Sequence, residues 1–145
     1  MVSANSSSIL ASMARKKLTS FDIGGSLAKA VFYVPKDDPA HVKLQQLDKL
    51  TKERLPDLTE GDCIYMKSCK NDQVETLFDF VRDNDLAGSD VYATGGGSVK
   101  YKSLFDSNFE QNGIKVHKRD EFISLVGGLN FVKDYVSEPT YTIDR

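Results

Sequence analysis

The sequence predicts an α/β protein built on a mixed β-sheet with flanking helices. After residue 60, strand-like segments alternate with helix-like segments, which is the order expected for a layered α/β domain. Near the N-terminus, two short strand-like segments are separated only by Gly24-Gly25-Ser26, a connection typical of an antiparallel hairpin. The chain has 145 residues and 40% hydrophobic residues, enough for one core. The sheet is therefore expected to contain antiparallel as well as parallel neighbours.

The predicted hairpin comprises residues 17–23 and 28–34, which are rich in β-branched and aromatic side chains. Pro35 ends its second strand. The polar segment 35–60 leaves two interpretations open, because its leucines are spaced as in a helix but its first apolar residues alternate as in a strand. Residues 63–68 form a further predicted strand.

The clearest helix is predicted over 71–85, where apolar residues follow the i, i+3, i+4, i+7 pattern. Asp72 with Glu75 resembles a capping box at its start. A short strand is expected over 90–93, followed by a helix over 98–109. A last short strand is expected over 114–117.

The final helix is predicted to run from about Asp120 to Val136 and to end before Pro139. Two adjacent glycines, Gly127 and Gly128, lie in its middle at a cost of about 1 kcal/mol each relative to Ala, so we expect a close neighbour there. Residues 140–143 resemble the beginning of another strand. The helix has one expected apolar face, formed by Phe122, Leu125, Val126, Leu129, Val132 and Val136.

Composition excludes several classes of function. The net charge is −2, which gives the chain no electrostatic reason to bind nucleic acid or an anionic membrane. Cys63 and Cys69 fall in one predicted strand, about 20 Å apart, so we expect free thiols in a reducing compartment such as the cytoplasm. Residues 1–17 form an expected flexible, Ser-rich tail. Its acid-poor bias also resembles a weak organelle-targeting peptide.

The first motif with possible chemistry is the segment 22–29. Asp22 ends a predicted strand, and Lys29 lies in the returning strand after Gly24, Gly25 and Ser26. Glycines allow backbone N–H groups to approach a polyphosphate, Lys29 can neutralise its charge, and Asp22 can hold Mg²⁺ directly or through water. A plain hairpin with a surface lysine remains the alternative.

Two further motifs follow predicted strands. Gly95, Gly96 and Gly97 connect a strand to a helix, and three successive glycines favour a ligand that approaches the backbone closely. Asp120 and Glu121 begin the last helix, where acidic residues also compensate the helix dipole. Paired carboxylates are loosely compatible with general-base chemistry.

Taken together, these motifs resemble the eukaryotic, or type II, pantothenate kinases from about residue 21 to residue 136. The segment 22–29 is shared with a wider superfamily of sugar kinases, chaperones and actin. The block 93–100, followed by Asp120-Glu121-Phe122 and then by Leu125-Val126-x-Gly128-Leu129, is more specific to pantothenate kinases.

The resemblance implies a ribonuclease-H-like lobe of the actin/hsp70/sugar-kinase superfamily over residues 18–145, with ATP in a cleft against a second lobe. It implies that the ATP phosphates and Mg²⁺ meet the segment 22–29, that Gly95–Gly97 line the cleft, and that Glu121 takes the proton from the pantothenate hydroxyl. Asp120 is left as the expected helix cap.

Further expectations follow from the same resemblance. Pantothenate and ATP are the expected partners, with acetyl-CoA regulation through the second lobe and a homo-oligomer for a full-length protein. Because the chain stops where a second lobe should begin, we expect little activity from it alone. Two alternatives are an inactive homologue that regulates a full-length kinase, and another small-molecule kinase of the same superfamily.

Overall fold

The computed structural model describes residues 16–47, 51–53 and 63–135. The strands are β1 (Leu18–Ile23), β2 (Leu27–Val34), β3 (Thr51–Glu53), β4 (Cys63–Lys70), β5 (Asp90–Thr94) and β6 (Lys115–Lys118). The helices are α2 (Pro39–Gln45), α3 (Val74–Asp83), α4 (Gly97–Lys100), α5 (Lys102–Asn108) and α6 (Glu121–Tyr135), with short 3₁₀ turns at Asn71–Gln73 and Glu110–Asn112.

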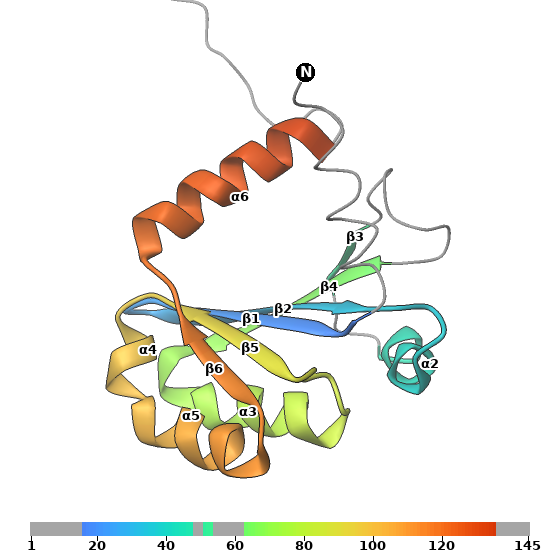
Figure 1. Cartoon of the computed structure of the whole chain (residues 1–145), viewed down its shortest axis with the longest axis horizontal. Helices are drawn as coiled ribbons and strands as arrows, with labels where there is room; N and C mark the ends of the chain where they lie inside the picture. The colour runs from blue at the N-terminus through green and yellow to red at the C-terminus, as the bar shows by residue number, and fades with distance from the viewer. Residues whose placement is uncertain (1–15, 48–50, 54–62, 136–145) are drawn as a thin grey trace, which may run out of the picture.

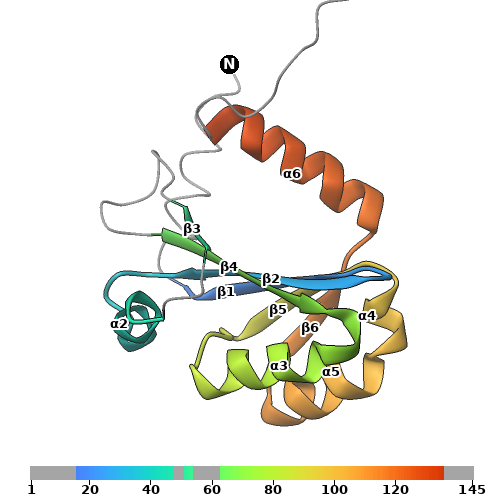
Figure 2. The ribbon, with the colours of Figure 1, turned by 180° about the vertical axis from the view of Figure 1, so that it is seen from behind.

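The six strands form one mixed sheet in the order β3-β4-β2-β1-β5-β6. β1 pairs antiparallel with β2, and β2 with β4, whereas β5 and β6 run parallel to β1. The hairpin and the mixed sheet predicted from the sequence are therefore confirmed. Helices α3, α4 and α5 cover one face of the sheet, and α6 extends above the other (Figures 1 and 2).

The core lies between the sheet and α3 and α5. Phe21 of β1 contacts Phe78 of α3 edge-on, with ring centroids 5.0 Å apart, and Phe78 lies 4.7 Å from Phe105 of α5. Side chains alternate along β1, so Phe21 and Ile23 are buried towards the helices while Asp22 points to the other face. That alternation brings the first motif to the open side of the sheet.

Several expectations are corrected by the structure. The capping box is wrong, because no side chain caps α3 and its N-terminal flank is the 3₁₀ turn Asn71–Gln73. That turn is held by the β1–β2 hairpin instead, since the Asn71 amide donates to the Ser26 carbonyl at 2.9 Å. The helix expected over 98–109 is two helices, interrupted at Tyr101.

The expectation for the last helix is also wrong in one respect. α6 starts one residue after the predicted start, and the predicted end at Val136 lies outside the described residues. Its side chains Phe122, Ile123, Leu125, Val126 and Leu129 are exposed, and nothing within 4 Å would meet a Cβ at Gly127 or Gly128. The open interpretation of 35–60 is resolved in part by α2, which Asp38 caps through a 2.9 Å hydrogen bond to the Ala40 amide.

Other expectations fall on residues that the structure does not describe. The strand expected at 140–143 and most of the tail lie outside the described residues. Lys17, at the end of the predicted tail, binds the carboxylate of Asp85 at 2.9 Å. Cys69 is a free thiol, and among the described residues no helix has the length and hydrophobicity needed to cross a membrane.

Candidate functional site

The three sequence motifs lie at one edge of the sheet. β1, β5 and β6 are parallel, so their carboxyl ends meet at the same edge. Asp22 at the end of β1 pairs in register with Thr94 at the end of β5, and the Arg119 amide after β6 donates to the Ala93 carbonyl at 2.8 Å. The β1–β2 hairpin, the start of α4 and the start of α6 therefore gather at this edge (Figure 1, left).

Asp22 and Lys29 form a cross-strand ion pair. They face each other in the β1–β2 register, and the Lys29 Nζ lies 3.2 Å from the Asp22 Oδ2. Both side chains are about half exposed, at 43% for Asp22 and 54% for Lys29. An ion pair in this exposed setting adds little stability. Both groups are accessible to a ligand at the sheet edge.

The fold does not itself require the glycines of the hairpin turn. The Gly24 amide donates to the Leu27 carbonyl at 2.9 Å, which closes the turn. A Cβ at Gly24 would meet only an ordinary contact at 3.7 Å, and a Cβ at Gly25 would meet nothing within 4 Å. Neither glycine has a positive φ. Bare backbone at these two positions, followed by the exposed Ser26, leaves room for a group that approaches the amides of Gly25 and Ser26.

In the second glycine cluster, Gly95–Gly97, two glycines are required by packing and one is not. Gly95 has a φ of +83°, and a Cβ there would lie 2.5 Å from the Ile23 carbonyl oxygen. A Cβ at Gly97 would lie 2.1 Å from Cγ2 of the Ile23 side chain, so these two glycines are required by packing against β1. Gly96 has helical dihedral angles and open space, so its missing side chain has no explanation in the fold.

A buried hydroxyl at the same edge has no partner. Among the described residues, no hydrogen-bond partner is found for the Thr94 Oγ1, although the atom is buried. Thr94 lies opposite Asp22 in the β1–β5 register. A buried hydroxyl without a partner costs free energy that a bound polar ligand or water would recover.

Asp120 and Glu121 have different roles. The Asp120 Oδ1 accepts a 2.9 Å hydrogen bond from the Ile123 amide, which confirms the expected helix cap. Glu121 is exposed in the first turn of α6. The two-residue link after β6 places Glu121 at the same edge as the Asp22 and glycine segments.

One polar cluster near the site was not predicted from the sequence. The His117 Nε2 lies 2.7 Å from the Asp90 Oδ1, and its ring stacks on Tyr92 at 5.0 Å between centroids. The Arg119 guanidinium lies 5.4 Å from the same Tyr92 ring. A hydrogen bond from the Ser89 hydroxyl, and then that to His117, hold the pKa of Asp90 below its usual value. The only signal for this cluster in the sequence is that Asp90 and Tyr92, like His117 and Arg119, are two residues apart, which places each pair on one face of its strand.

The donor set at the edge suits Mg²⁺ held mainly by phosphates and water. Among the described residues, no three His, Cys, Asp or Glu side chains cluster around a common metal position. Asp22 supplies one carboxylate, which is a common arrangement for Mg²⁺ because this ion keeps several waters and binds substrate phosphates. The residues present are therefore compatible with a magnesium–nucleotide complex.

Comparison with known proteins places these features in a family. The Fumble family model matches residues 18–145. Pantothenate kinase 1 of Arabidopsis thaliana is 29% identical over 83% of this chain and 32% of its own length. The pantothenate kinase of Schizosaccharomyces pombe is 26% identical over 85% of this chain and 30% of its own length. A mouse protein named 4'-phosphopantetheine phosphatase is 29% identical over 86% of this chain and 16% of its own length.

The chain thus spans about a third or less of the length of these curated relatives. The match nevertheless includes all three motifs at the sheet edge and every described strand and helix. The chain therefore belongs to the Fumble family and resembles part of a eukaryotic pantothenate kinase.

Proposed function

We propose that this chain carries the nucleotide-binding part of an enzyme that phosphorylates pantothenate to 4'-phosphopantothenate with ATP, the first step of coenzyme A synthesis. One observation carries the proposal: the Asp22–Lys29 hairpin, the Gly95–Gly97 turn and Glu121 come from three distant segments and meet at one sheet edge. Relatives named pantothenate kinase support the choice of reaction.

We also propose that the sheet and its helices form one ribonuclease-H-like lobe. A central β1 with the antiparallel ladder of β2, β4 and β3 on one side and the parallel strands β5 and β6 on the other is compatible with a ribonuclease-H-like lobe of the actin/hsp70/sugar-kinase superfamily. We assign residues 18–145 to that lobe. A second lobe would close the cleft, exclude water and orient both substrates.

The hairpin and the glycine turn are the proposed phosphate site. The amides of Gly25 and Ser26 would donate to phosphate oxygens, and the bare backbone of Gly24, whose own amide closes the turn, would allow their approach. Lys29 would leave its ion pair with Asp22 to neutralise the phosphate charge. Gly96 would leave the approach to the phosphates unobstructed, as its open surroundings allow. Asp22 would then be released to hold Mg²⁺ directly or through water, and the ion would offset the charge of the phosphates.

Glu121 is the proposed general base. It is exposed at the start of α6, next to the edge that gathers the phosphate-site residues. Its carboxylate would accept the proton of the pantothenate hydroxyl as that oxygen attacks the γ-phosphorus, whose bond to the bridging oxygen breaks to release ADP. Asp120 is engaged as the helix cap, which leaves Glu121 as the available carboxylate of the pair.

A second candidate function is a catalytically inactive homologue that binds or regulates a full-length kinase. Two observations favour it: a mouse relative is named for a phosphatase rather than a kinase, and the apolar residues Phe122, Ile123, Leu125, Val126 and Leu129 of α6 are exposed.

We further propose that the protein lies in the cytoplasm. Acetyl-CoA regulation and homo-oligomers would belong to the complete two-lobed protein.

Calorimetric titration of the chain with MgATP tests the first proposal. We expect binding that Lys29→Ala weakens by about tenfold or more, because a charge-assisted contact is lost. The control is Lys43→Ala on α2, far from the edge (Figure 1). A radiolabelled pantothenate assay of the Schizosaccharomyces pombe pantothenate kinase, with and without this chain added, then separates the candidates, since a change in that enzyme's turnover favours the regulatory homologue. Equal MgATP affinity in both variants would contradict the phosphate site.

A further inference from the structure

One residue outside the three motifs binds the hairpin turn at two points. Asn71 follows β4 and begins the 3₁₀ turn that leads into α3. Its backbone amide donates to the Ser26 carbonyl at 2.9 Å, and its side-chain Nδ2 donates to the Gly24 carbonyl. These two carbonyls belong to the peptide groups that come just before and just after the Gly25–Ser26 peptide. Asn71 therefore holds the backbone on both sides of the turn's central peptide.

The contacts of Asn71 also set the direction of an amide in the turn. In a trans peptide group the N–H points opposite to the C=O. Because the Gly24 carbonyl is bound by Asn71, the Gly25 N–H points away from Asn71. Within the part of the chain that the structure describes, the amides of Gly25 and Ser26 donate to no protein group. Amides that are held in place but unpaired suit an anionic ligand.

The Tyr101 hydroxyl fixes the orientation of the Asn71 side chain. Tyr101 lies between α4 and α5, and its hydroxyl donates to the Asn71 Oδ1, with the Asn71 carbonyl oxygen 3.2 Å away. An asparagine amide has an acceptor end and a donor end. Since Tyr101 occupies the acceptor end, the donor end is turned to Gly24. The Tyr101 amide also donates to the Gly97 carbonyl at 2.9 Å, so Tyr101 is bonded to the second glycine segment as well.

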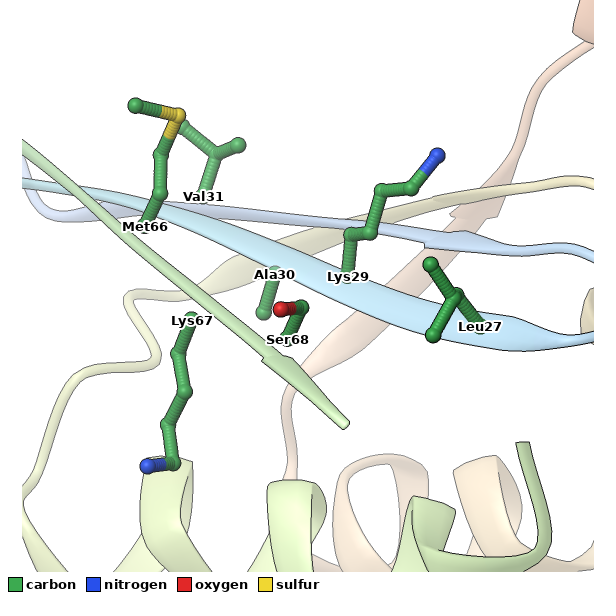
Figure 3. A pocket seen from close by; sticks show the side chains of 7 residues that line it. All are labelled: Leu27, Lys29, Ala30, Val31, Met66, Lys67 and Ser68. Carbon is green, nitrogen blue, oxygen red and sulfur yellow. The ribbon is translucent and has the colours of Figure 1, made fainter. Parts of the chain in front are cut away.

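Tyr101 approaches the turn from the face of the sheet that the helices cover. α4 and α5, which flank it, lie on that face (Figures 1 and 2). Lys29 points to the opposite, open face, whereas Lys67 of β4 points towards the helices (Figure 3). A phosphate that binds Lys29 would therefore meet the turn from the side away from Tyr101. Asn71 and Tyr101 support the turn from behind without touching such a ligand.

We infer that Asn71 and Tyr101 are positioning residues for the hairpin turn. They hold the Gly25 and Ser26 amides in place before a ligand arrives, and in this way they raise the affinity of the turn for phosphate oxygens. A mobile turn would have to be ordered on binding, at a cost in free energy that a turn already ordered does not incur. The inference rests on the proposed phosphate site and adds to it two residues that none of the sequence motifs indicated.

Calorimetric titration of the full chain with MgATP tests the inference. Tyr101→Phe removes the hydroxyl and keeps the ring, and we expect it to weaken MgATP binding by about threefold or more. Asn71→Ala removes both side-chain contacts, and we expect about tenfold. Asn84→Ala is the matched control, because the Asn84 side chain also donates to a backbone carbonyl, that of Phe80 at 2.8 Å, but at the other end of α3. It should leave the affinity unchanged.

The titrations are made at a temperature at which circular dichroism shows every variant folded. A purely structural link would lower the thermal midpoint and leave the affinity of the folded chain unchanged, and that result overturns the inference. If Tyr101 acts through Asn71, adding Tyr101→Phe to Asn71→Ala should cause no further loss of affinity. Additive losses would contradict this order of action.

Relaxation of the ¹⁵N amides of Gly25 and Ser26, measured without nucleotide, separates a failure of this inference from a failure of the phosphate site. We expect both amides to be as ordered as those of β1 and β2, and to be more mobile in Asn71→Ala and Tyr101→Phe. Equal mobility in all variants overturns the inference. Absence of MgATP binding by the unaltered chain would overturn the phosphate site and the effect on affinity, and the relaxation data would still decide whether the two residues order the turn.

Discussion

Replacing Gly97 by alanine would place a methyl group inside the volume of the Ile23 side chain. The added Cβ would lie 2.1 Å from Cγ2 and 2.6 Å from Cβ of Ile23, and 2.9 Å from its carbonyl oxygen. Ile23 is fully buried at the end of β1, so it has no free space to move into. The start of α4 and the end of β1 must therefore separate.

Overpacking of this kind costs about 1–3 kcal/mol. At about 2–4 °C per kcal/mol for a chain of this size, Gly97→Ala should lower the thermal midpoint by about 2–12 °C. Gly96→Ala is the matched control, because Gly96 has a φ of −58° and no atom within 4 Å of a built Cβ. That variant should be neutral or stabilising by up to about 1 kcal/mol, since alanine restricts the unfolded chain.

The pair also separates the structural glycines from the proposed ligand-binding ones. Gly96→Ala should keep the fold but weaken MgATP binding if the phosphates approach this backbone. Calorimetric unfolding of both variants, followed by MgATP titration of Gly96→Ala, measures both effects. If Gly97→Ala melts at the wild-type temperature, or if Gly96→Ala is the less stable of the two, the packing argument is refuted.

Three other predictions follow from single side chains. Asp120→Ala should lower stability by about 1 kcal/mol through loss of the helix cap, whereas Glu121→Gln should leave the thermal midpoint unchanged. A larger loss of stability in Glu121→Gln than in Asp120→Ala would contradict the assigned roles. Burial raises the pKa of the Cys69 thiol, so its alkylation at neutral pH, followed by peptide mass spectrometry, should be slower than that of an unfolded control; equal rates would contradict this. Hydrogen bonds from Ser89 and His117 lower the pKa of Asp90, so its contribution to stability is complete above the unfolded carboxyl pKa of about 3.9 and is lost as pH falls through the lower folded value. Asp90→Asn should therefore reduce the fall of the thermal midpoint with pH below about 4, and an unchanged pH profile would count against it.

The fold was predictable where periodicity was strong. The hairpin around Gly24 and Gly25, the helix that became α3, and the strands β5 and β6 follow from alternation, helical spacing and turn residues. The capping box failed because a backbone contact from the hairpin to Asn71 replaces the cap, and no local pattern encodes a partner 45 residues away in sequence. The orientation of α6 was missed because an apolar face does not specify which surface covers it.

The candidate site was only partly predictable. The glycine-rich segments identified the residues, and parallel pairing explained why they meet at one edge. The sequence could not separate Gly95 and Gly97, which β1 packing requires, from Gly96, which has open space. It also gave no sign of the unpartnered Thr94 hydroxyl or of the stack of His117 on Tyr92, because these depend on register between strands.

The carboxyl edge of β1, β5 and β6 is the proposed site for the phosphates of MgATP. A titration of the ¹⁵N-labelled chain with MgATP, followed through amide chemical shifts, tests this proposal. We expect saturable shifts confined to residues 22–29 and 94–97 and to the start of α6, with Lys43 of α2 unchanged. Absence of shifts at millimolar MgATP, or shifts centred on another surface, would contradict it.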